Sequence, residues 1–349
     1  MKLKTLVRNM LYALSRINIL ERTLILYSGA DLGFSGNIKY GYEKITKSEY
    51  FSQYKVVYLS KDRGKGVYLY SLKGIMYALF TKNFIINVQM PPFVSCKHKN
   101  VIQLWHGIPV KCIGKNAENY SSEVIDKIVA EFKEYNYIFT SGDGFTQLIK
   151  ESFCIEDDSK FICSKNFVQS YLIEMQEKYI NKAEIINILY APTFRTDGIG
   201  GWNLLRHHNE LIPLLEEINA RLTCKYHPST AAVDRLDDCH DLINVKDDDL
   251  AELLLCSDII ITDYSSVIFD AALLKKEIYL YCEDFDMYMK SRGKCAKEVF
   301  SGFNVCLDVG QLVEVIRMRK GINAFSRVNS DFHEYVTEGD ICQRIVELL

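Results

Sequence analysis

Short apolar segments alternate with amphipathic segments along almost the whole chain. Helices are predicted between the apolar segments, for example over Tyr120–Tyr135 and Asn209–Ala220. This alternation is typical of parallel β-sheets whose faces are covered by helices. The predicted strands fall into two groups, Thr23–Tyr27, Lys55–Leu59, Phe84–Val88, Val101–Trp105 and Tyr137–Thr140, then Ile185–Tyr190, Arg221–Tyr226, Ile259–Thr262 and Ile278–Tyr281. The pattern therefore predicts an α/β fold with two doubly wound domains.

The polar stretch Val168–Glu184 separates the two groups of strands and is predicted to be helical. A boundary near Asn181 gives an N-terminal domain over residues 1–180 and a C-terminal domain over residues 181–349. Open α/β sheets bind ligands at the carboxyl ends of their strands. We therefore expect the functional residues at strand ends, in a cleft between the two domains.

The strand-turn-helix segment Asp258–Leu274 carries the most informative local pattern. The apolar strand Ile259–Thr262 is followed at once by the polar turn Asp263-Tyr264-Ser265-Ser266 and then by an apolar helical face. Unpaired backbone N–H groups at such a helix start, together with the hydroxyls of Ser265 and Ser266, are suited to a phosphate or pyrophosphate. A serine N-cap without any ligand explains the same local pattern equally well.

Three further polar segments follow predicted strands. A neutral imidazole takes up a proton near neutral pH, and hydroxyl and guanidinium groups suit phosphate oxygens. For each segment an ordinary structural role, such as a buried histidine beside Trp105 or a surface arginine, is the alternative. Together with the serine turn, the segments favour phosphoryl transfer, in which the protein positions groups and neutralises charge. The residues concerned are His106, Gly107 and Lys111; Thr193 and Arg195; and His227.

Composition narrows the class of protein. The 349 residues are 48% hydrophobic and 25% charged, which is typical of globular proteins, and the net charge of -3 gives no reason to expect nucleic acid as a partner. The 11 cysteines include no CxxC pair, so we expect reduced thiols and no zinc site. The triplet Asp284-Phe285-Asp286 is only a weak indication of a divalent metal. The chain has no GxGxxG, no P-loop and no GxSxG pattern.

The first twenty residues predict a basic amphipathic helix. Its apolar positions share one face, basic residues flank them, and no acidic residue occurs before Glu21. Such a helix suits an anionic membrane surface, and a helix packed on its own domain is the equal alternative. No apolar run reaches the roughly 18 residues of a membrane span. The basic residues are Lys2, Lys4, Arg8 and Arg16.

With these motifs in order, the chain resembles the CDP-glycerol:poly(glycerophosphate) glycerophosphotransferase family over most of its length. The pair HGxPxK and ITDYSS, in this order, is the most specific part of the resemblance. The matching segments are HGIPVK at His106–Lys111, PTFR at Pro192–Arg195, the pair His227-Pro228, ITDYSS at Ile261–Ser266 with Asp270, GDICQRI at Gly339–Ile345 and the turn Ser28–Tyr40.

The resemblance implies a GT-B fold, with an acceptor-side and a donor-binding Rossmann-like domain, and transfer of a polyol phosphate with release of CMP. It implies CDP-glycerol or CDP-ribitol as donor, with no certain cofactor and the divalent metal open. It also implies a lipid-linked or polymeric acceptor in teichoic acid or capsule synthesis. The expected reduced cysteines and the basic N-terminal helix predict a cytoplasmic enzyme, peripheral on the inner membrane face. His106 would be the general base, and His227 would stabilise the leaving CMP. The residues assigned to donor phosphate are Ser265, Ser266, Thr193, Arg195 and Asp263, and other cleft residues are Gly107, Lys111, Asp270 and Arg292.

The chain departs from the family pattern on the acceptor side. Cys163–Tyr171, CSKNFVQSY, replaces a Pro-Arg-Asn-Asp segment, and the residues after Gly293 differ as well. Alternative functions with the same fold are a GT-B glycosyltransferase or a UDP-sugar 2-epimerase, and a third is an inactive nucleotide-binding scaffold. The choice between glycerol and ribitol, the number of units added and the oligomeric state stay open at this point.

Overall fold

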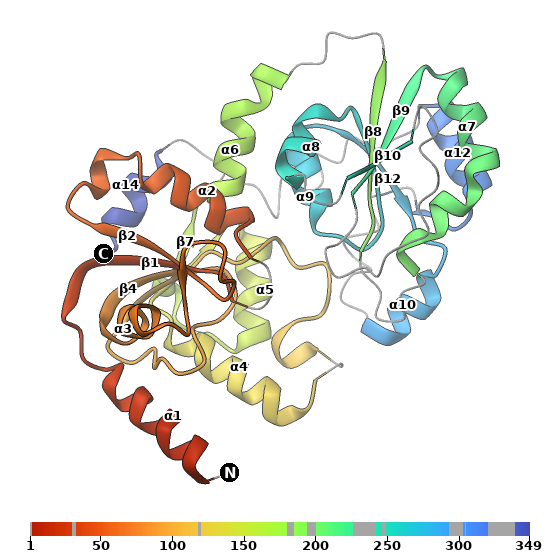
Figure 1. Ribbon diagram of the computed structural model, residues 1–349. Coiled ribbons are helices and arrows are strands. Elements are labelled where there is room, and N and C mark those ends of the chain that lie inside the picture. Colours follow the sequence, from red (N-terminus) through yellow and green to blue (C-terminus); the bar gives the residue numbers. More distant parts are fainter. Residues whose placement is uncertain are drawn as a thin grey trace. The chain divides into compact units, whose positions relative to one another are not determined.

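The computed structural model describes residues 2–29, 33–117, 120–179, 185–193, 200–225, 242–245, 249–292, 303, 305–319 and 339–349. The chain divides into two compact units (Figure 1). Unit 1 comprises Met1–His106, Ser122–Tyr171 and Glu334–Leu349, and unit 2 comprises Gly107–Ser121 and Leu172–His333. The units thus interleave along the sequence, because the short segment after His106 belongs to unit 2 and the C-terminus belongs to unit 1. The assignment of residues 1–180 and 181–349 to an acceptor and a donor domain stays a prediction.

Unit 1 is built on a seven-stranded parallel sheet with the strand order β3-β2-β1-β4-β5-β6-β7. The central strand β1 buries Leu24, Ile25 and Leu26 completely. A continuous apolar run of this kind forms a strand that is covered on both faces, which is the usual state in a parallel sheet. The strands are β1 (Leu20–Tyr27), β2 (Lys55–Ser60), β3 (Val67–Tyr68), β4 (Thr81–Ile86), β5 (Asn100–Gln103), β6 (Tyr137–Thr140) and β7 (Phe161–Cys163).

Helices pack around this sheet in Figure 1. The C-terminal helix is tied to unit 1 because Asn100 Nδ2 donates a hydrogen bond of 2.8 Å to the Leu348 carbonyl. The helices that begin in unit 1 are α1 (Lys2–Leu14), α2 (Gly36–Ile45), η1 (Glu49–Phe51), α3 (Leu72–Phe80), α4 (Ser122–Glu134), α5 (Asp143–Phe153), η3 (Asp158–Lys160), α6 (Phe167–Met175) and α14 (Ile341–Val346).

Unit 2 holds a six-stranded parallel sheet with the order β10-β9-β8-β11-β12-β13. Its strands are β8 (Ile186–Ala191), β9 (Ala220–Lys225), β10 (Leu242–Val245), β11 (Ile259–Thr262), β12 (Glu277–Tyr281) and β13 (Val305–Cys306). Its helices are η2 (Gly114–Asn116), η4 (Gln176–Tyr179), η5 (Gly200–His207), α7 (His208–Glu217), α8 (Leu250–Cys256), α9 (Val267–Leu273), α10 (Phe285–Arg292) and α12 (Val309–Arg317). The core on one side of the sheet includes Leu214, Leu222, Ile261 and Leu312, each at most 1% exposed.

The two predicted doubly wound sheets are confirmed, and all nine predicted strands are present with small shifts of their ends. The short strands β3, β7, β10 and β13, of two to four residues each, were not predicted. β5 ends at Gln103, two residues before the predicted end. The reason is that Trp105 takes a left-handed backbone conformation with φ of 58°, which cannot continue a strand.

Candidate functional site

The first candidate residue, His106, follows β5 in unit 1 and is exposed. Its ring stacks on the Trp105 ring, with centroids 4.9 Å apart and planes inclined by 26°. Its Nδ1 lies 3.2 Å from the backbone carbonyl oxygen of Asn87, which follows β4. A carbonyl oxygen can only accept, so Nδ1 carries the proton in the neutral ring and Nε2 carries the lone pair. This is the tautomer that a general base acting through Nε2 requires.

Gly107 begins the segment of unit 2 that carries the rest of the HGIPVK motif. Its φ of 142° is a conformation that side chains with a Cβ rarely adopt. A Cβ at this position would lie 2.8 Å from Ser266 Oγ, so the backbone of Gly107 packs directly on the start of α9. Lys111, four residues later, places its Nζ 5.9 Å from the centre of the Tyr288 ring. Unit 2 therefore brings Gly107 and Ser266 together.

The end of β11 is fastened to the end of β8 by Asp263, which is 3% exposed. Asp263 Oδ1 accepts hydrogen bonds from the backbone N of Thr193 at 2.8 Å, from Thr193 Oγ1 at 2.6 Å and from the backbone N of Tyr264 at 2.6 Å. One residue earlier, Thr262 Oγ1 donates to the Ala191 carbonyl at 2.7 Å. Thr193 is thus held in place by a buried carboxylate.

The aromatic side chain within the same turn is buried. Tyr264 is 1% exposed, stacks on Tyr288 with ring centres 3.6 Å apart, and donates its hydroxyl hydrogen to Asp284 Oδ1 at 2.9 Å. Burial, followed by the nearby Cys282 and Asp284, raises the pKa of Tyr264 far above its usual range, so its hydroxyl stays protonated. Asp284 therefore serves as a hydrogen-bond acceptor for this turn, which accounts for one acid of the Asp-Phe-Asp triplet without any metal.

The two serines that end the turn are half-buried. Ser265 Oγ accepts a hydrogen bond of 3.3 Å from the Val267 backbone N, whereas the N-cap residue Ser266 makes no side-chain capping bond. α9 has seven residues, so its dipole contributes little, and hydroxyl and backbone N–H groups would carry most of the attraction for an anion. The geometry thus suits a hydrogen-bonding cradle more than a helix-dipole site.

Asp270 lies one turn into α9 and is half-buried. Burial raises the pKa of its carboxyl group to about 7. No hydrogen bond or ion pair of this carboxylate occurs among the described residues. Asp270 is therefore a carboxyl group that changes its charge within the physiological pH range.

Three predicted site residues are not fully described. Arg195 and His227 lie outside the described residues, and Arg292 is described only as the last residue of α10, without its side chain. Their assignments stay predictions. Within the described ranges, no cluster of three His, Cys, Asp or Glu side chains offers a metal site.

The described cysteines are reduced, as expected from the sequence, with one exception. Eight described cysteines are free thiols, whereas Cys112 is disulfide-bonded. The expectation of reduced thiols throughout is therefore wrong at Cys112.

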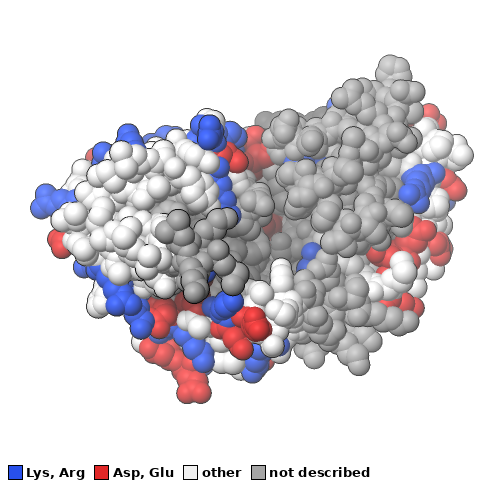
Figure 2. Space-filling view, turned by 60° about the horizontal axis from the view of Figure 1, so that its bottom comes forward, with Lys and Arg blue, Asp and Glu red and all other residues white. Residues whose placement is uncertain are grey.

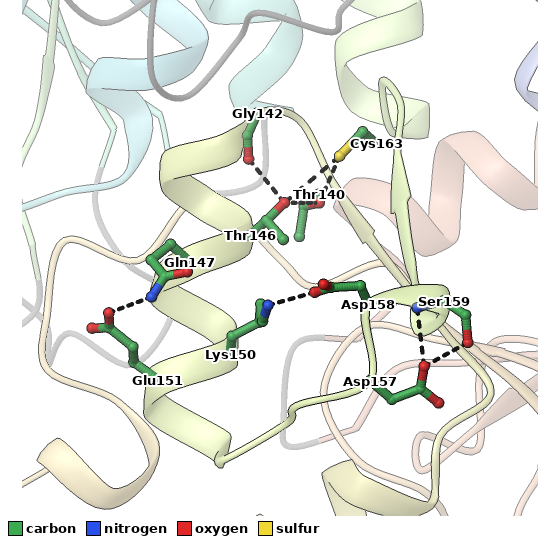
Figure 3. Close-up of polar contacts among 10 residues, drawn as sticks. All are labelled: Thr140, Gly142, Thr146, Gln147, Lys150, Glu151, Asp157, Asp158, Ser159 and Cys163. Carbon is green, nitrogen blue, oxygen red and sulfur yellow. Dashed lines mark hydrogen bonds and ion pairs between the residues drawn. The ribbon is translucent and has the colours of Figure 1, made fainter.

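The acceptor-side departure Cys163–Tyr171 forms the end of β7 and the start of α6. Figure 3 shows Thr140, Thr146 and Cys163 pointing toward one another, with the two hydroxyl oxygens 2.7 Å apart and each 3.7 Å from Cys163 Sγ. Asn166 and Gln169 then cap α6 reciprocally, since the side-chain oxygen of each accepts the backbone N–H of the other at 2.9 Å. These contacts fix the local backbone of the segment.

Charge on the described surface is mixed. Lys and Arg side chains are interspersed with Asp and Glu side chains over the face shown in Figure 2. None of the described helices combines the length and apolarity that a membrane span requires. Any anionic substrate would therefore be held by local groups, as the net charge of -3 already indicates.

Buried polar residues around Trp105 were missed by the sequence analysis. Asn37 and Gln103 hydrogen-bond to the backbone of Trp105, and Asn87 contacts His106 through its carbonyl. Asn37 lies within the turn Ser28–Tyr40 that the family resemblance had already included, so its position was a usable signal. Gln103 and Asn87 sit in strand-like sequence and gave no signal.

Comparison with known proteins identifies similar sequences. The profile of the family CDP-Glycerol:Poly(glycerophosphate) glycerophosphotransferase matches residues 10–349. A teichoic acid poly(glycerol phosphate) polymerase of Bacillus spizizenii is 23% identical, over 94% of this chain and 92% of that protein. A teichoic acid ribitol-phosphate primase of the same species is 28% identical, over 90% of this chain and 87% of that protein.

Solved structures share the fold. The wall teichoic acid polymerase TagF matches with a TM-score of 0.80 and 18% identity, over 98% of this chain and 91% of that chain. A UDP-GlcNAc 2-epimerase of Methanocaldococcus jannaschii matches with a TM-score of 0.58 and 10% identity, over 93% of this chain and 99% of that chain. The expected GT-B class, with two Rossmann-like units, is confirmed.

Proposed function

The chain belongs to the CDP-Glycerol:Poly(glycerophosphate) glycerophosphotransferase family, and from this premise we propose that it transfers glycerol phosphate or ribitol phosphate from a CDP-activated donor to an acceptor hydroxyl. CMP is the second product. The relatives support both polyols, since they include glycerol-phosphate and ribitol-phosphate primases and polymerases of teichoic acid.

The donor is bound by unit 2 in this proposal. Ser265 and Ser266 offer hydroxyl and backbone N–H groups to the diphosphate. The family pattern adds Thr193 from the neighbouring strand end, and both its backbone N–H and its hydroxyl hydrogen are donated to Asp263. Asp263, which the family pattern also assigns to donor phosphate, accepts the backbone N–H and the hydroxyl hydrogen of Thr193 through its Oδ1. Its part is to hold Thr193 in place and to repel a misplaced anion. The family pattern adds Arg195 and His227 to this group as neutralising residues.

The acceptor is activated by His106. Nε2 takes the proton from the acceptor hydroxyl as its oxygen attacks the phosphorus that carries the polyol. The bond between that phosphorus and the bridging oxygen breaks, and CMP leaves with the bonding electron pair. A well-placed general base of this kind is worth about 10²–10⁴ in rate. His227 would stabilise the charge that develops on CMP.

The observation that carries the proposal is the packing of Gly107 on Ser266. An added Cβ on Gly107 would lie only 2.8 Å from Ser266 Oγ. Gly107 directly follows His106 in the chain, so the residue next to the proposed base is in contact with the proposed phosphate cradle. Lys111 and Arg292 belong to the same proposal as cationic groups, and Asp270 as a carboxylate for donor hydroxyls.

The acceptor is proposed to be a lipid-linked or polymeric polyol phosphate or saccharide of teichoic acid or capsule synthesis. We place the enzyme in the cytoplasm on the inner membrane face, with α1 as its contact with anionic lipid. Leu6 and Met10 of α1 are 65% and 56% exposed, and Arg8 is also exposed. Helix α3 contacts α1 and leaves Leu72 79% exposed.

A donor screen tests the proposed function. The purified protein would be incubated with CDP-glycerol, CDP-ribitol and UDP-GlcNAc in the presence of a polyol-phosphate acceptor, and products would be identified by mass. Release of CMP with growth of the acceptor by one polyol phosphate is expected. Interconversion of the UDP-sugar without CMP release would replace this proposal with an epimerase.

His106→Ala tests the base. Turnover is expected to fall by about 10²–10⁴, while the melting temperature and the affinity for the CDP-polyol stay unchanged. His207→Ala is the matched control, since His207 is a half-buried histidine that pairs with Glu210 at 3.9 Å. Near-normal turnover of purified His106→Ala would show that another group takes the proton.

A further inference from the structure

The strained residue next to the proposed base is the basis of the inference. Trp105 has a φ of 58°, a left-handed conformation that is unfavourable for a bulky residue. Its ring is 7% exposed and packs edge-on against Phe132 and Phe153. Nothing in the local sequence favours this conformation, so the surrounding structure must impose it.

Two buried side-chain amides hold the backbone of Trp105 from both sides. Gln103 Oε1 accepts a hydrogen bond of 2.9 Å from the Trp105 N–H, and Asn37 Nδ2 donates one of 2.9 Å to the Trp105 carbonyl. Gln103 is 0% and Asn37 3% exposed. Both bonds are therefore shielded from water, so breaking either one would leave a buried polar group without a partner.

Each amide uses its remaining end to join a second segment of unit 1. Gln103 Nε2 donates to the Val88 carbonyl at 2.7 Å, and Asn37 Oδ1 accepts from the Val168 N–H at 3.0 Å. Val88 directly follows Asn87, whose carbonyl oxygen lies 3.2 Å from His106 Nδ1. Gln103 thus fixes both the backbone that precedes His106 and the segment that sets its tautomer.

We infer that Asn37 and Gln103 are positioning residues, which hold Trp105 in its left-handed conformation and thereby orient the His106 imidazole with its proton on Nδ1. Neither residue touches the reacting atoms. The inference deepens the proposed function, since the orientation serves the acceptor hydroxyl. The inference also predicts that these two amides determine the tautomer of His106 when no substrate is bound.

Isosteric variants test the inference. Asn37→Asp keeps the acceptor for Val168 and loses the donor to Trp105, and Gln103→Glu keeps the acceptor for Trp105 and loses the donor to Val88. Asn83→Asp is the control, because Asn83 is also a buried asparagine of unit 1, and its Nδ2 donates to the Glu21 carbonyl at 2.8 Å, away from Trp105. We expect kcat to fall about 10–100-fold in the first two variants, with the donor KM nearly unchanged, and to fall much less in the control.

Two measurements without substrate separate positioning from general damage. In a Trp202→Phe background Trp105 is the single tryptophan, and its emission should report protonation of the His106 ring stacked on it. Imidazole ¹⁵N NMR should show the Nδ1–H tautomer in the wild type and a mixture in Asn37→Asp and Gln103→Glu. Gln103→Met provides a second, uncharged variant if either acid prevents folding.

The possible results distinguish a failure of this inference from a failure of the proposed function. A wild-type tautomer and pH titration in both acid variants would overturn the inference, as would equal kcat losses in these variants and in Asn83→Asp. If the wild type transferred no polyol phosphate at all, the proposed function would fail, and the change of tautomer in the variants would still decide the inference.

Discussion

Gly107 and Ser266 approach so closely that a methyl group on the glycine would lie 2.8 Å from the serine hydroxyl oxygen. Such a distance is too short for a real Cβ contact, and the φ of 142° at Gly107 disfavours any side chain in addition. The contact lies within unit 2 and joins the HGIPVK segment to the start of α9.

Replacing Gly107 with alanine should therefore displace this segment from Ser266. We expect Gly107→Ala to lose about 10²-fold or more in kcat, since small misplacements of catalytic groups have effects of this size. The melting temperature should fall only slightly, because only one loop must shift. Gly64→Ala is the control, because nothing lies within 4 Å of a Cβ at Gly64. Equal activity of the two variants would show that the contact is not needed.

The double hydrogen bond from Thr193 to Asp263 gives a second prediction. Thr193→Val keeps the shape of the side chain and removes the hydroxyl that lies 2.6 Å from Asp263 Oδ1. Loss of a hydrogen bond to a carboxylate costs about 1.5–3 kcal/mol. We therefore expect a lower melting temperature and a donor KM raised about tenfold or more. Thr193→Ser retains the hydroxyl and should keep both values close to those of the wild type, and equal losses in the two variants would show that the hydroxyl is not the cause.

The strands and the strand-end motifs could be predicted because each depends on neighbours in sequence. Ile259–Thr262 is apolar over four residues and is followed by a polar turn, and the structure has β11 at these same residues. The hydrogen bonds that position the motifs could not be predicted, because they join residues far apart in sequence. Asn37 and Trp105 are 68 positions apart, and Thr193 and Asp263 are 70 apart.

The interleaving of the two units along the chain could not be predicted from the sequence either. Gly107–Ser121 belongs to unit 2 although it is flanked by segments of unit 1, and no change in composition marks its ends. The left-handed conformation of Trp105 could not be predicted from the sequence for a similar reason. A bulky aromatic residue does not favour a φ of 58° by itself, so this conformation depends on tertiary contacts.

Asp270 should make stability depend on pH. Burial raises the pKa of its carboxyl to about 7 in the folded protein, against a reference value of 3.8. The folded-state pKa lies above the unfolded one, so the stability contribution of the protonated group is complete below about pH 4 and is lost as the pH rises through about 7. The charged carboxylate then destabilises the fold.

Asp270→Asn removes the loss of stability that the buried carboxylate causes at high pH. At pH 8 the variant should be more stable than the wild type by roughly 1–4 kcal/mol, the upper value being the full shift of the pKa. The difference should shrink steadily as the pH is lowered to 4. Melting temperatures of both proteins between pH 4 and 8 would show this, with Asp286→Asn as a control at an exposed aspartate of α10. A difference that did not vary with pH would mean that the carboxyl is not the titrating group.

The last prediction concerns α1 and an anionic bilayer. Deletion of residues 2–20 should lower binding to vesicles that contain phosphatidylglycerol, and the loss should be larger at low salt, because the basic residues act through a screened charge interaction. A milder variant tests the two contributions separately. Leu6→Gln with Met10→Gln removes exposed apolar area from α1, and Arg8→Gln with Arg16→Gln removes two exposed positive charges.

The charge variant should weaken binding by about 1 kcal/mol for each arginine and should lose its effect in high salt. The apolar variant should weaken binding at all salt concentrations, because burial of apolar area is not screened. Lys47→Gln with Lys65→Gln is the charge-matched control, since both lysines are exposed and lie outside α1. Binding that fell equally in this control would reflect net charge alone, and binding unchanged by the deletion would assign α1 to packing on its own unit.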